Sequence, residues 1–424
     1  MKQTLKVATL LSLSTATLLA SGWRIPEQSL NGTALSAAYV AGANGADASY
    51  YNPANMAFMA DGAEIETAMT YIYLSKIKYT DSTGFINDSK EEHFAMPTMH
   101  YVSPKQGNLR YGLSIVAPGG LSKRWDETYA KSSAEDFTLK IIEVNPTVSY
   151  LVNEQFAVGF GLRALYSEGL VKSNASSLAI RDMEGDSIDF GYNLAMSYKP
   201  TSDLTVSATY RSKVDLTEKG HADLFMNGAL IAAAGSTASY SGATTLTIPL
   251  PASLALAAAY TMDKTTVEFV FERTYWSSYE NLDFDYSGAY TSTGVIGASV
   301  ITALQAKFDA PKDRLWKDVN AYRIGVSHQY SDALKLMAGF AIDKNAAPDE
   351  TLGFELPDSD AKLYSVGFEY KLSEKMKIGL AYLYDQKESR TVLDSTASAT
   401  NPVPNGTFEN ASAHLVTASL KYKF

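Results

Sequence analysis

The chain has 424 residues, of which 46% are hydrophobic, so it is long enough to bury a sizeable core. Its formal net charge of −10 argues against a nucleic-acid partner, because a phosphate-binding surface needs clustered Lys and Arg to displace counterions. The absence of cysteine excludes thiolate metal sites, cysteine nucleophiles and disulfides, while 27 tyrosines suit both strands and membrane interfaces.

The N-terminus has the features of a secretory signal peptide, which we place at residues 1–20. A basic start precedes an apolar stretch from Val7 to Leu19, and small residues follow from Ala20 to Gly22. A first transmembrane helix is the alternative, but serines and threonines interrupt the apolar run, which falls short of about 20 residues. The mature chain is expected to begin at Ser21 or Gly22.

The next segment, residues 21–58, is rich in Ala, Gly, Ser and Asn and lacks sustained alternation, which begins at about Ile65. Near its end lies Asn52-Pro53-Ala54. Pro53 fixes φ and has no amide donor, and the residue before a proline is pushed out of the helical region, so the chain should turn here. We interpret the segment as a small plug; a flexible N-terminal leader is the alternative.

Residues 59–424 show a two-residue alternation of apolar and polar side chains. Successive side chains in a strand point to opposite faces, so each alternating segment has one apolar face and one small or polar face. No run of about 18 apolar residues follows the signal peptide, so no helix is expected to span a membrane. The clearest alternating segments are Phe156–Tyr166, Leu204–Arg211, Tyr322–Tyr330, Tyr364–Leu372 and Ile378–Tyr384.

The connections between these segments alternate in length. Short ones at residues 198–203 and 329–332 alternate with long ones at residues 173–187, 221–242 and 288–316. Short turns at one end and long loops at the other, joining strands bordered by Tyr and Phe, are typical of an outer-membrane β-barrel. A soluble sandwich would show more regular turn signals. We therefore predict an all-β, transmembrane antiparallel β-barrel whose polar faces line a lumen.

The C-terminus indicates that the barrel closes. His414 to Tyr422 alternates apolar and polar residues, and the chain ends on the aromatic Phe424. A last strand must pair with the first to leave no open edge in the membrane. A terminal Phe also resembles the sorting signal of outer-membrane barrels.

One strand is predicted to be broken. Tyr111 to Val116 alternates cleanly and is followed by Ala117-Pro118-Gly119-Gly120, which places a residue without an amide donor beside two residues without side chains. A central barrel strand does not continue through such a sequence. A simple loop at the strand end is the alternative to a kink.

Several short blocks stand out in order along the chain: G-W-R-I-P-E-Q-S (22–29), N-G-T-A-L-S-A-A-Y (31–39), Y-N-P-A (51–54), P-T-M-H-Y-V-S-P (97–104), A-P-G-G-L (117–121), T-Y-R-S-K-V (209–214), A-Y-R-I-G (321–325) and L-P-D-S-D (356–360). Together they resemble the FadL family of outer-membrane transporters of hydrophobic compounds. The resemblance covers nearly the whole mature chain, and the ordered set is more specific than any one block.

This resemblance implies a barrel of about fourteen strands (residues 59–424) whose lumen holds a small N-terminal hatch (residues 21–58). Asn52, Pro53 and Ala54 resemble the hatch motif and are expected to hold the plug in one conformation. Pro118, Gly119 and Gly120 resemble an inward kink of the third strand, which opens a lateral gap. Direct release of a hydrophobic molecule into lipid avoids its transfer through water, and this transfer would cost about 0.8 kcal/mol per methylene.

The resemblance also implies an apolar pocket with a basic group for a carboxylate. The candidates are Arg314, which gap-free matching favours, Lys317 and, more approximately, Lys172; Lys312 is a further neighbour. Solvated lysines and arginines at a barrel rim are the alternative. Residues 173–187 form a short polar segment where fatty-acid members carry a long loop, which leaves the cargo open.

Two outer segments are unusually apolar, L-F-M-N-G-A-L-I-A-A-A (224–234) and G-V-I-G-A-S-V-I-T-A-L (294–304). A hydrophobic landing groove would explain them, and so would packing of the loops on each other. The five histidines are scattered, and H-E-x-x-H, G-x-S-x-G and phosphate-loop motifs are absent, so no enzyme and no cofactor is expected.

We therefore expect a monomeric outer-membrane protein that takes up a hydrophobic small molecule passively, in contact with outer-membrane lipid and lipopolysaccharide. Fatty acids, alkanes and aromatic hydrocarbons remain open as cargo. A general diffusion porin for small solutes is the alternative, and an outer-membrane hydrolase is a third hypothesis.

Overall fold

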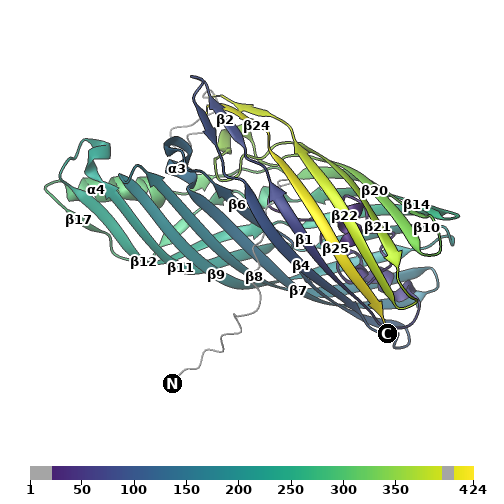
Figure 1. The fold of residues 1–424 in the computed structure, drawn as a ribbon. Coiled ribbons are helices and arrows are strands. Elements are labelled where there is room, and N and C mark those ends of the chain that lie inside the picture. The colour runs from purple at the N-terminus through teal and green to yellow at the C-terminus, as the bar shows by residue number, and fades with distance from the viewer. Residues whose placement is uncertain (1–21, 394–404) are drawn as a thin grey trace.

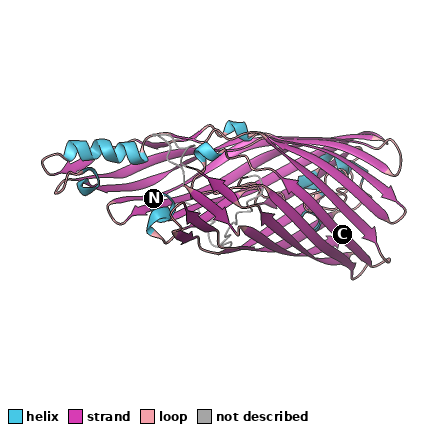
Figure 2. Ribbon diagram, turned by 90° about the horizontal axis from the view of Figure 1, so that it is seen from above, coloured by secondary structure: helices cyan, strands magenta, loops and turns pink. Residues whose placement is uncertain are grey.

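The computed structural model describes residues 22–393 and 405–424. The predicted signal peptide, residues 1–20, therefore lies outside the described residues. Strands dominate the molecule and the helices are short (Figure 2). Within the described ranges, no helix is long and apolar enough to cross a membrane.

The strands form one closed antiparallel barrel, as predicted (Figure 1). The last strand pairs with the first, from Glu64 opposite Lys423 to Leu74 opposite Ala413. Four courses of the wall are each divided into pieces, namely β5/β6, β10/β11, β12/β13 and β14/β16/β17, so that fourteen courses surround the lumen. The bounds of the strands in the wall are β1 (Glu64–Leu74), β4 (Glu92–Val102), β5 (Leu109–Val116), β6 (Gly120–Arg124), β7 (Asp136–Asn153), β8 (Phe156–Ala175), β9 (Ala179–Tyr198), β10 (Leu204–Arg211), β11 (Val214–Asn227), β12 (Thr237–Leu250), β13 (Ser253–Met262), β14 (Thr265–Thr274), β16 (Phe284–Tyr286), β17 (Thr291–Thr293), β19 (Val319–Gln329), β20 (Leu334–Asp343), β21 (Ala361–Lys371), β22 (Met376–Lys387) and β25 (Ser412–Lys423).

The alternation in the sequence matches the two faces of the wall. In β8, Phe160 and Leu162 are exposed on the outer surface, whereas Arg163 and Leu165 are buried on the inner side. The outer surface carries a broad set of exposed aromatic and aliphatic side chains, as expected for a surface in contact with lipid. Polar and charged side chains are buried against the lumen instead.

The wall is drawn out into a long extension at one end, opposite the C-terminus (Figure 1). Additional elements lie along this outer rim. They are β2 (Lys78–Asp81), β3 (Ile86–Asp88), β23 (Arg390–Val392) and β24 (Gly406–Glu409) in one small sheet, β15 (Asn281–Leu282) paired with β18 (Lys312–Asp313), the helices α3 (Thr128–Ala134) and α4 (Gly297–Phe308), and the 3-10 turns η2 (Gly228–Ile231), η3 (Trp276–Ser278) and η4 (Asp349–Thr351).

Two predicted long loops are wrong. Residues 173–187 belong largely to β8 and β9, which are joined by a tight turn with Ser176 and Ser177 at positive φ. Much of residues 221–242 likewise belongs to β11 and β12. These ends project beyond the membrane, so their alternation uses small and charged residues, and the hydrophobic signal of a strand is weak there.

The apolar segment within residues 288–316 contains helix α4. Its Val300, Leu304 and Phe308 are buried in the same apolar cluster as Ala238 and Tyr240 of β12. Packing of the outer elements on each other therefore accounts for that face, while Val295 just before the helix is fully exposed.

The N-terminal segment lies inside the barrel. It contains α1 (Leu30–Ala34), α2 (Ala48–Tyr51) and the 3-10 turn η1 (Pro53–Phe58). We call residues 22–58 the hatch. Side chains of the wall contact it from many strands, so the lumen is filled by the chain's own N-terminal part.

Candidate functional site

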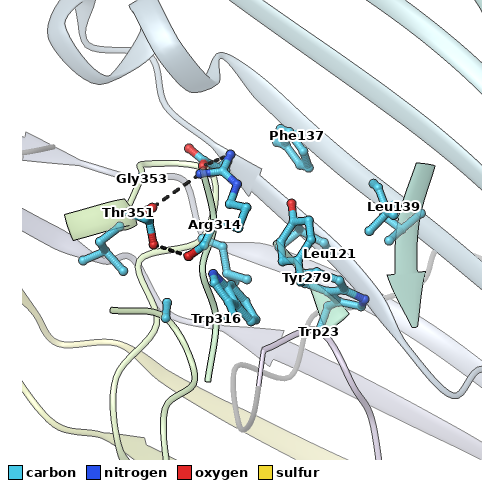
Figure 3. A pocket seen from close by; sticks show the side chains of 14 residues that line it. Trp23, Leu121, Phe137, Leu139, Tyr279, Arg314, Trp316, Thr351 and Gly353 are labelled. Atoms are coloured by element: carbon cyan, nitrogen blue, oxygen red, sulfur yellow. Dashed lines mark hydrogen bonds and ion pairs between the residues drawn. The ribbon is translucent and has the colours of Figure 1, made fainter. Parts of the chain in front are cut away.

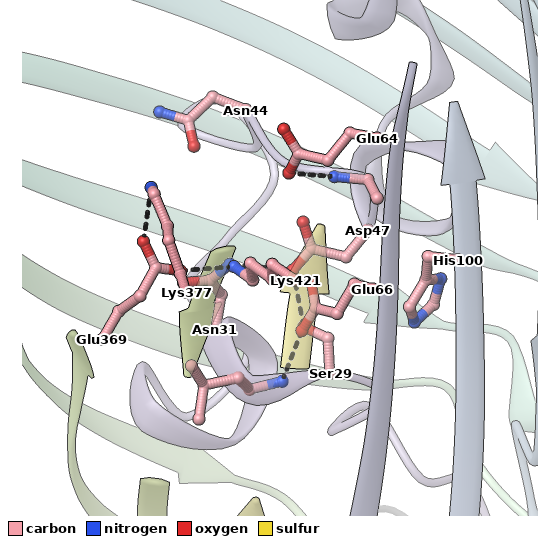
Figure 4. Close-up of polar contacts among 12 residues, drawn as sticks. Ser29, Asn31, Asn44, Asp47, Glu64, Glu66, His100, Glu369, Lys377 and Lys421 are labelled. Carbon is pink, nitrogen blue, oxygen red and sulfur yellow. Dashed lines mark hydrogen bonds and ion pairs between the residues drawn. The ribbon is translucent and has the colours of Figure 1, made fainter. Parts of the chain in front are cut away.

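A buried polar network joins the hatch to the wall (Figure 4). Within the hatch, the carboxylate of Asp47 accepts hydrogen bonds from Ser29 (2.7 Å), Asn31 (2.8 Å) and Tyr39 (3.1 Å). Beside it, Lys421 of β25 forms ion pairs with Glu369 (2.7 Å) and Glu66 (3.4 Å). Buried charges need such partners, so this side of the hatch has one favoured position.

A second anchor comes from the opposite wall. The carboxylate of Glu268 on β14 accepts hydrogen bonds from three consecutive backbone amides, those of Val40 (2.6 Å), Ala41 (2.6 Å) and Gly42 (2.9 Å). Such a concave run of N–H groups is suited to an anion. Glu268 therefore fixes the loop in the middle of the hatch.

The predicted hatch motif lies against the inner face of β8 and β9. Asn52 donates from its side-chain amide to the carbonyl of Val40 and to the hydroxyl of Ser197, both at 2.9 Å. Pro53 starts the 3-10 turn η1, and Ala54 is fully buried. The three residues thus connect one hatch loop, the hatch turn and the wall.

Gly159 of β8 offers a direct test of this contact. A Cβ atom added there would lie 2.5 Å from the amide nitrogen of Ala54 and 2.8 Å from the carbonyl carbon of Pro53. Both are backbone atoms, so Gly159→Val is expected to displace the hatch or to destabilise the folded barrel by about 1–3 kcal/mol. The thermal unfolding midpoint checks this against Gly185→Val, which is expected to lower the midpoint less, because a Cβ there lies 3.3 Å from the nearest backbone atom, a tight but milder contact. Equal midpoints would contradict the close contact.

The predicted break in the third strand is an inward kink. β5 pairs with β7 up to Val116, and β6 resumes the pairing at Gly120. In between, the backbone joins the hatch: Ile25 donates to the carbonyl of Pro118, and Gly120 donates to the carbonyl of Trp23, both at 2.9 Å. A Cβ on Gly119 would lie 2.8 Å from the Trp23 carbonyl, so this approach requires glycine.

The kink leaves part of β4 without a neighbour. β4 pairs with β5 only from Met99 to Val102, so residues 92–98 have no strand partner on that side. Pro97 lies in this stretch and has no amide to satisfy, which suits an unpaired edge. An apolar groove of about 570 Å³ adjoins the kink on the outer face, lined by residues that include Met69, Met99 and Ile115.

An aromatic pocket lies above the hatch, between the kinked strand and the outer loops (Figure 3). Trp23 of the hatch packs against Trp276 (4.5 Å between ring centroids), Tyr279 (4.9 Å) and Trp316 (5.1 Å). Leu121, immediately after the kink, lines the same pocket. The cavity itself measures about 20 Å³, room for about one water, because Trp23 fills it.

The three basic candidates occupy different places. Arg314 lines the aromatic pocket, where its guanidinium pairs with Glu355 at 2.7 Å. Lys317 is exposed and does not line the pocket. Lys172 forms a half-exposed cross-strand ion pair with Asp182 (2.8 Å). Arg314 is thus the one candidate at the pocket, and its charge is already balanced.

A cluster of cations lies beside Arg314. Arg181 on β9 is 4% exposed, and its guanidinium carbon lies 4.5 Å from the ring centroid of Phe284. Its Nε and Nη1 atoms make no hydrogen bond of ordinary geometry, and the hydroxyl of Tyr286 is the polar group beside it. Burial, and then the charge of Arg181, lower the pKa of Lys312 to about 8. Glu355 is the one carboxylate among the groups acting on Lys312, and Arg314 and Lys307 add further positive charge. Around Lys312, therefore, the positive charges named here outnumber the one carboxylate.

Sequence reasoning expected an apolar pocket with Arg314 but missed Arg181, Glu355 and the aromatic lining of the pocket. Three of the four tryptophans of the chain meet in the pocket, so the positions of these few residues could have indicated its lining. Arg181 lies in the segment that was interpreted as a polar loop. The burial of Arg181 could be predicted only by a reader who knew that β8 and β9 continue beyond the membrane.

A closed barrel with an apolar outer surface, an internal hatch and an aromatic pocket defines an integral outer-membrane protein of the transporter class. A family model described as outer membrane protein transport protein (OMPP1/FadL/TodX) matches residues 11–424. The chain belongs to this family, which consists of outer-membrane transporters and channels.

Individual relatives are distant. The long-chain fatty acid transport protein of Escherichia coli K12 is 23% identical over 337 residues, which cover 69% of this chain and 71% of that protein. A solved FadL homologue of Pseudomonas aeruginosa has a TM-score of 0.79 at 19% identity, covering 95% of this chain and all of that one. The P. putida toluene transporter TodX has a TM-score of 0.67 at 18% identity, covering 93% of this chain and 99% of that one. These structures show that the fold is shared.

Proposed function

We propose that the protein takes up long-chain fatty acids passively through the outer membrane, with the aromatic pocket as the internal binding site and the kink as the exit. The observation that carries this proposal is the place of Trp23. Its ring fills the aromatic pocket, while its carbonyl accepts the hydrogen bond from Gly120 at the kink. One residue of the hatch thus contacts both the binding site and the exit.

Binding and gating are coupled through this residue. A fatty acid is far larger than a cavity of about 20 Å³, so the bound chain must displace the Trp23 ring. Displacement of Trp23 also removes the backbone partner of Gly120, which loosens the hatch at the kink. A ligand shifts an equilibrium only by its different affinity for two states, and here the displaced state alone has room for it.

The exit leads sideways into lipid. The apolar groove of about 570 Å³ beside the kink continues to the outer face of the wall. Each methylene that stays out of water retains about 0.8 kcal/mol, so a lateral path is favoured over the polar route past the hatch. At the periplasmic end, by contrast, the cavity is lined by charged residues that include Asp61, Arg110 and Lys199.

The cation cluster favours a carboxylate over a neutral hydrocarbon. Arg181 and Lys312 lie close to Arg314, and the guanidinium of Arg181 has two buried N–H groups free to donate. A carboxylate would complete both the charge and the hydrogen bonds. In this arrangement Arg181 binds the carboxylate of the fatty acid directly. Arg314 stays paired with Glu355 and adds positive charge nearby.

The test is a binding comparison between a long-chain fatty acid and the alcohol of the same length, together with mass analysis of molecules that co-purify with the protein. The fatty acid is expected to bind more tightly by roughly tenfold or more, since charged hydrogen bonds contribute about 1.5–3 kcal/mol. Equal affinities would contradict carboxylate recognition while leaving hydrophobic transport intact. Free ion conduction through an empty barrel would favour the porin alternative.

The pH dependence of fatty-acid binding should follow Lys312. Its amine is protonated below a pKa of about 8 and attracts a carboxylate, and this attraction is lost as the pH rises through that value. Affinity is therefore expected to be full near neutral pH and to fall above about pH 8. Titration of binding against pH checks this, and Lys312→Met should give a flatter profile at lower affinity. A profile of Lys312→Met that is identical to the native one would exclude a role for Lys312.

A further inference from the structure

The wall has a second interruption, on the far side of β7 and β8 from the kink. β10 pairs with β9 as far as Arg211, opposite Asn193, and β11 pairs with β9 again from Lys219, opposite Asp186. Between these points, residues 187–192 of β9 lie opposite residues 212–218, and no hydrogen-bonded ladder pairs these two described segments with each other. The first segment has six residues and the second has seven. We call this gap the β9–β11 seam.

The two sides of the seam belong to intact neighbours. β9 pairs with β8 without interruption from Tyr198 to Ala179. β11 stays paired with β12 throughout, with Val214 opposite Leu250. The chain of β12 breaks at Pro251 just beyond this pair. The β11–β12 pair therefore bends away from β9 as a unit, which leaves the seam between two stable sheets.

Few hydrogen bonds cross the seam among the described residues. Ser212 and Tyr192 exchange two at its lower end, with the Ser212 amide donating to the Tyr192 carbonyl (2.9 Å) and the Tyr192 amide donating to the Ser212 hydroxyl (3.0 Å). Farther out, the Thr217 amide donates to the side chain of Asp189 (3.2 Å). A continuous ladder would instead make a bond at nearly every second residue of each strand, so the seam is much easier to open.

Apolar side chains lie on both faces of the seam, beside polar ones that include Asp189 and the buried Glu218 on the inner side. On the outside, Ile188 and Phe190 of β9 are 65% and 74% exposed, while the opposite segment carries the half-exposed ion pair between Lys213 and Asp215 (2.8 Å). On the inside, Leu216 is fully buried in the apolar cluster that also contains Leu121, Phe137 and Ile248 of the aromatic pocket. Strands β6 to β9 thus cover the pocket. The strand pairing is interrupted at both edges of this group of strands, at the kink on one side and at the β9–β11 seam on the other.

We propose that the β9–β11 seam is a second lateral passage, through which an alkyl chain moves between the aromatic pocket and the outer leaflet of the membrane. This inference rests on the proposed function of the pocket. The seam and the kink are independent interruptions, and only the kink is covered by the hatch. The seam is closed instead by Ser212, whose carbonyl also accepts a hydrogen bond from the buried Arg163 (2.7 Å), by the side chain of Val214 against Gly191, and by Asp189.

A disulfide across the seam tests this. The native chain has no cysteine, and a Cβ atom on Gly191 would lie 2.8 Å from the Ser212 hydroxyl oxygen and 2.6 Å from Cγ2 of Val214. Gly191→Cys with Ser212→Cys therefore places two thiols for bonding, in a Val214→Ala background that removes the clash. Thr261→Cys with Thr266→Cys is the matched control, because these hydroxyls lie 2.9 Å apart across the intact β13–β14 ladder, away from the seam. Uptake of a labelled long-chain fatty acid is measured in cells expressing each pair, oxidised and then reduced.

Oxidation of the seam pair is expected to slow uptake by about twofold if the two passages share the flux, and reduction should restore it. The control pair should be indifferent to oxidation. Asp189→Ala, which removes the hydrogen bond between the Thr217 amide and Asp189, should raise uptake. Equal rates for the oxidised and reduced seam pair, with the disulfide verified, would overturn the second passage. A reduced protein that takes up no fatty acid would instead overturn the proposed function itself.

Discussion

Replacement of Arg181 by methionine is expected to weaken the binding of a long-chain fatty acid by roughly 10- to 100-fold, which corresponds to the loss of a charged hydrogen-bonding partner. The binding of the alcohol of equal chain length should change little. Titration of both ligands against the native and variant proteins measures the effect. A parallel loss for the alcohol would indicate damage to the pocket rather than loss of a head-group partner.

The stability of the same variant separates the two explanations further. Without ligand, Arg181 is a buried cation with two unpartnered N–H groups, a state that costs free energy. Methionine keeps most of the volume and removes the charge, so the unfolding midpoint should stay equal or rise. A marked fall would mean that Arg181 holds the outer strands together. Lys172→Met is a suitable control, because its ion pair with Asp182 lies away from the pocket.

Replacement of Glu268 by alanine is expected to release the middle of the hatch. The carboxylate receives three backbone hydrogen bonds, each contributing about 1.5–3 kcal/mol, and within the described part of the chain these amides donate to no other side chain. The variant should show frequent openings in planar bilayers, whereas the native protein should stay closed to ions. Single-channel recording measures this directly.

Glu268→Gln provides a graded comparison, since an amide oxygen keeps one acceptor without the charge. Its opening frequency should lie between those of the native protein and Glu268→Ala. An exposed carboxylate elsewhere on the barrel, such as Glu374 at a short turn, serves as a control that should leave the lumen closed. Closed behaviour of Glu268→Ala would show that the other contacts suffice to hold the hatch.

The barrel could be predicted because lipid on one side and a polar lumen on the other impose a strict period of two on every strand within the membrane. The exposed Phe160 and Leu162 follow this rule. Beyond the membrane the outer face meets water, so the rule lapses, and residues 173–187 were wrongly expected to form a loop. The kink at Pro118 was visible because proline and glycine act locally.

The pocket could be predicted only in part. Arg314 was proposed from the family resemblance, by its spacing from the A-Y-R-I-G block, but its partner Glu355 is far away in sequence and no local pattern joins them. The same holds for Trp23 and Trp316, which meet only because the hatch extends through the lumen. Pairings of this kind depend on barrel closure and on the path of the hatch, neither of which has a short-range signal.

Arg110 on β5 sets a limit on how far the hatch can travel. Its buried guanidinium donates to the carbonyls of Ser103 (2.8 Å), Met59 (3.0 Å), Ala60 (2.9 Å) and Gly62 (2.6 Å), which fastens the C-terminal end of the hatch to the wall. On the proposed function, the Trp23 end is displaced while this end stays fixed. A cell that carries this protein would then keep its permeability barrier to hydrophilic solutes during uptake, because the hatch as a whole would not leave the barrel.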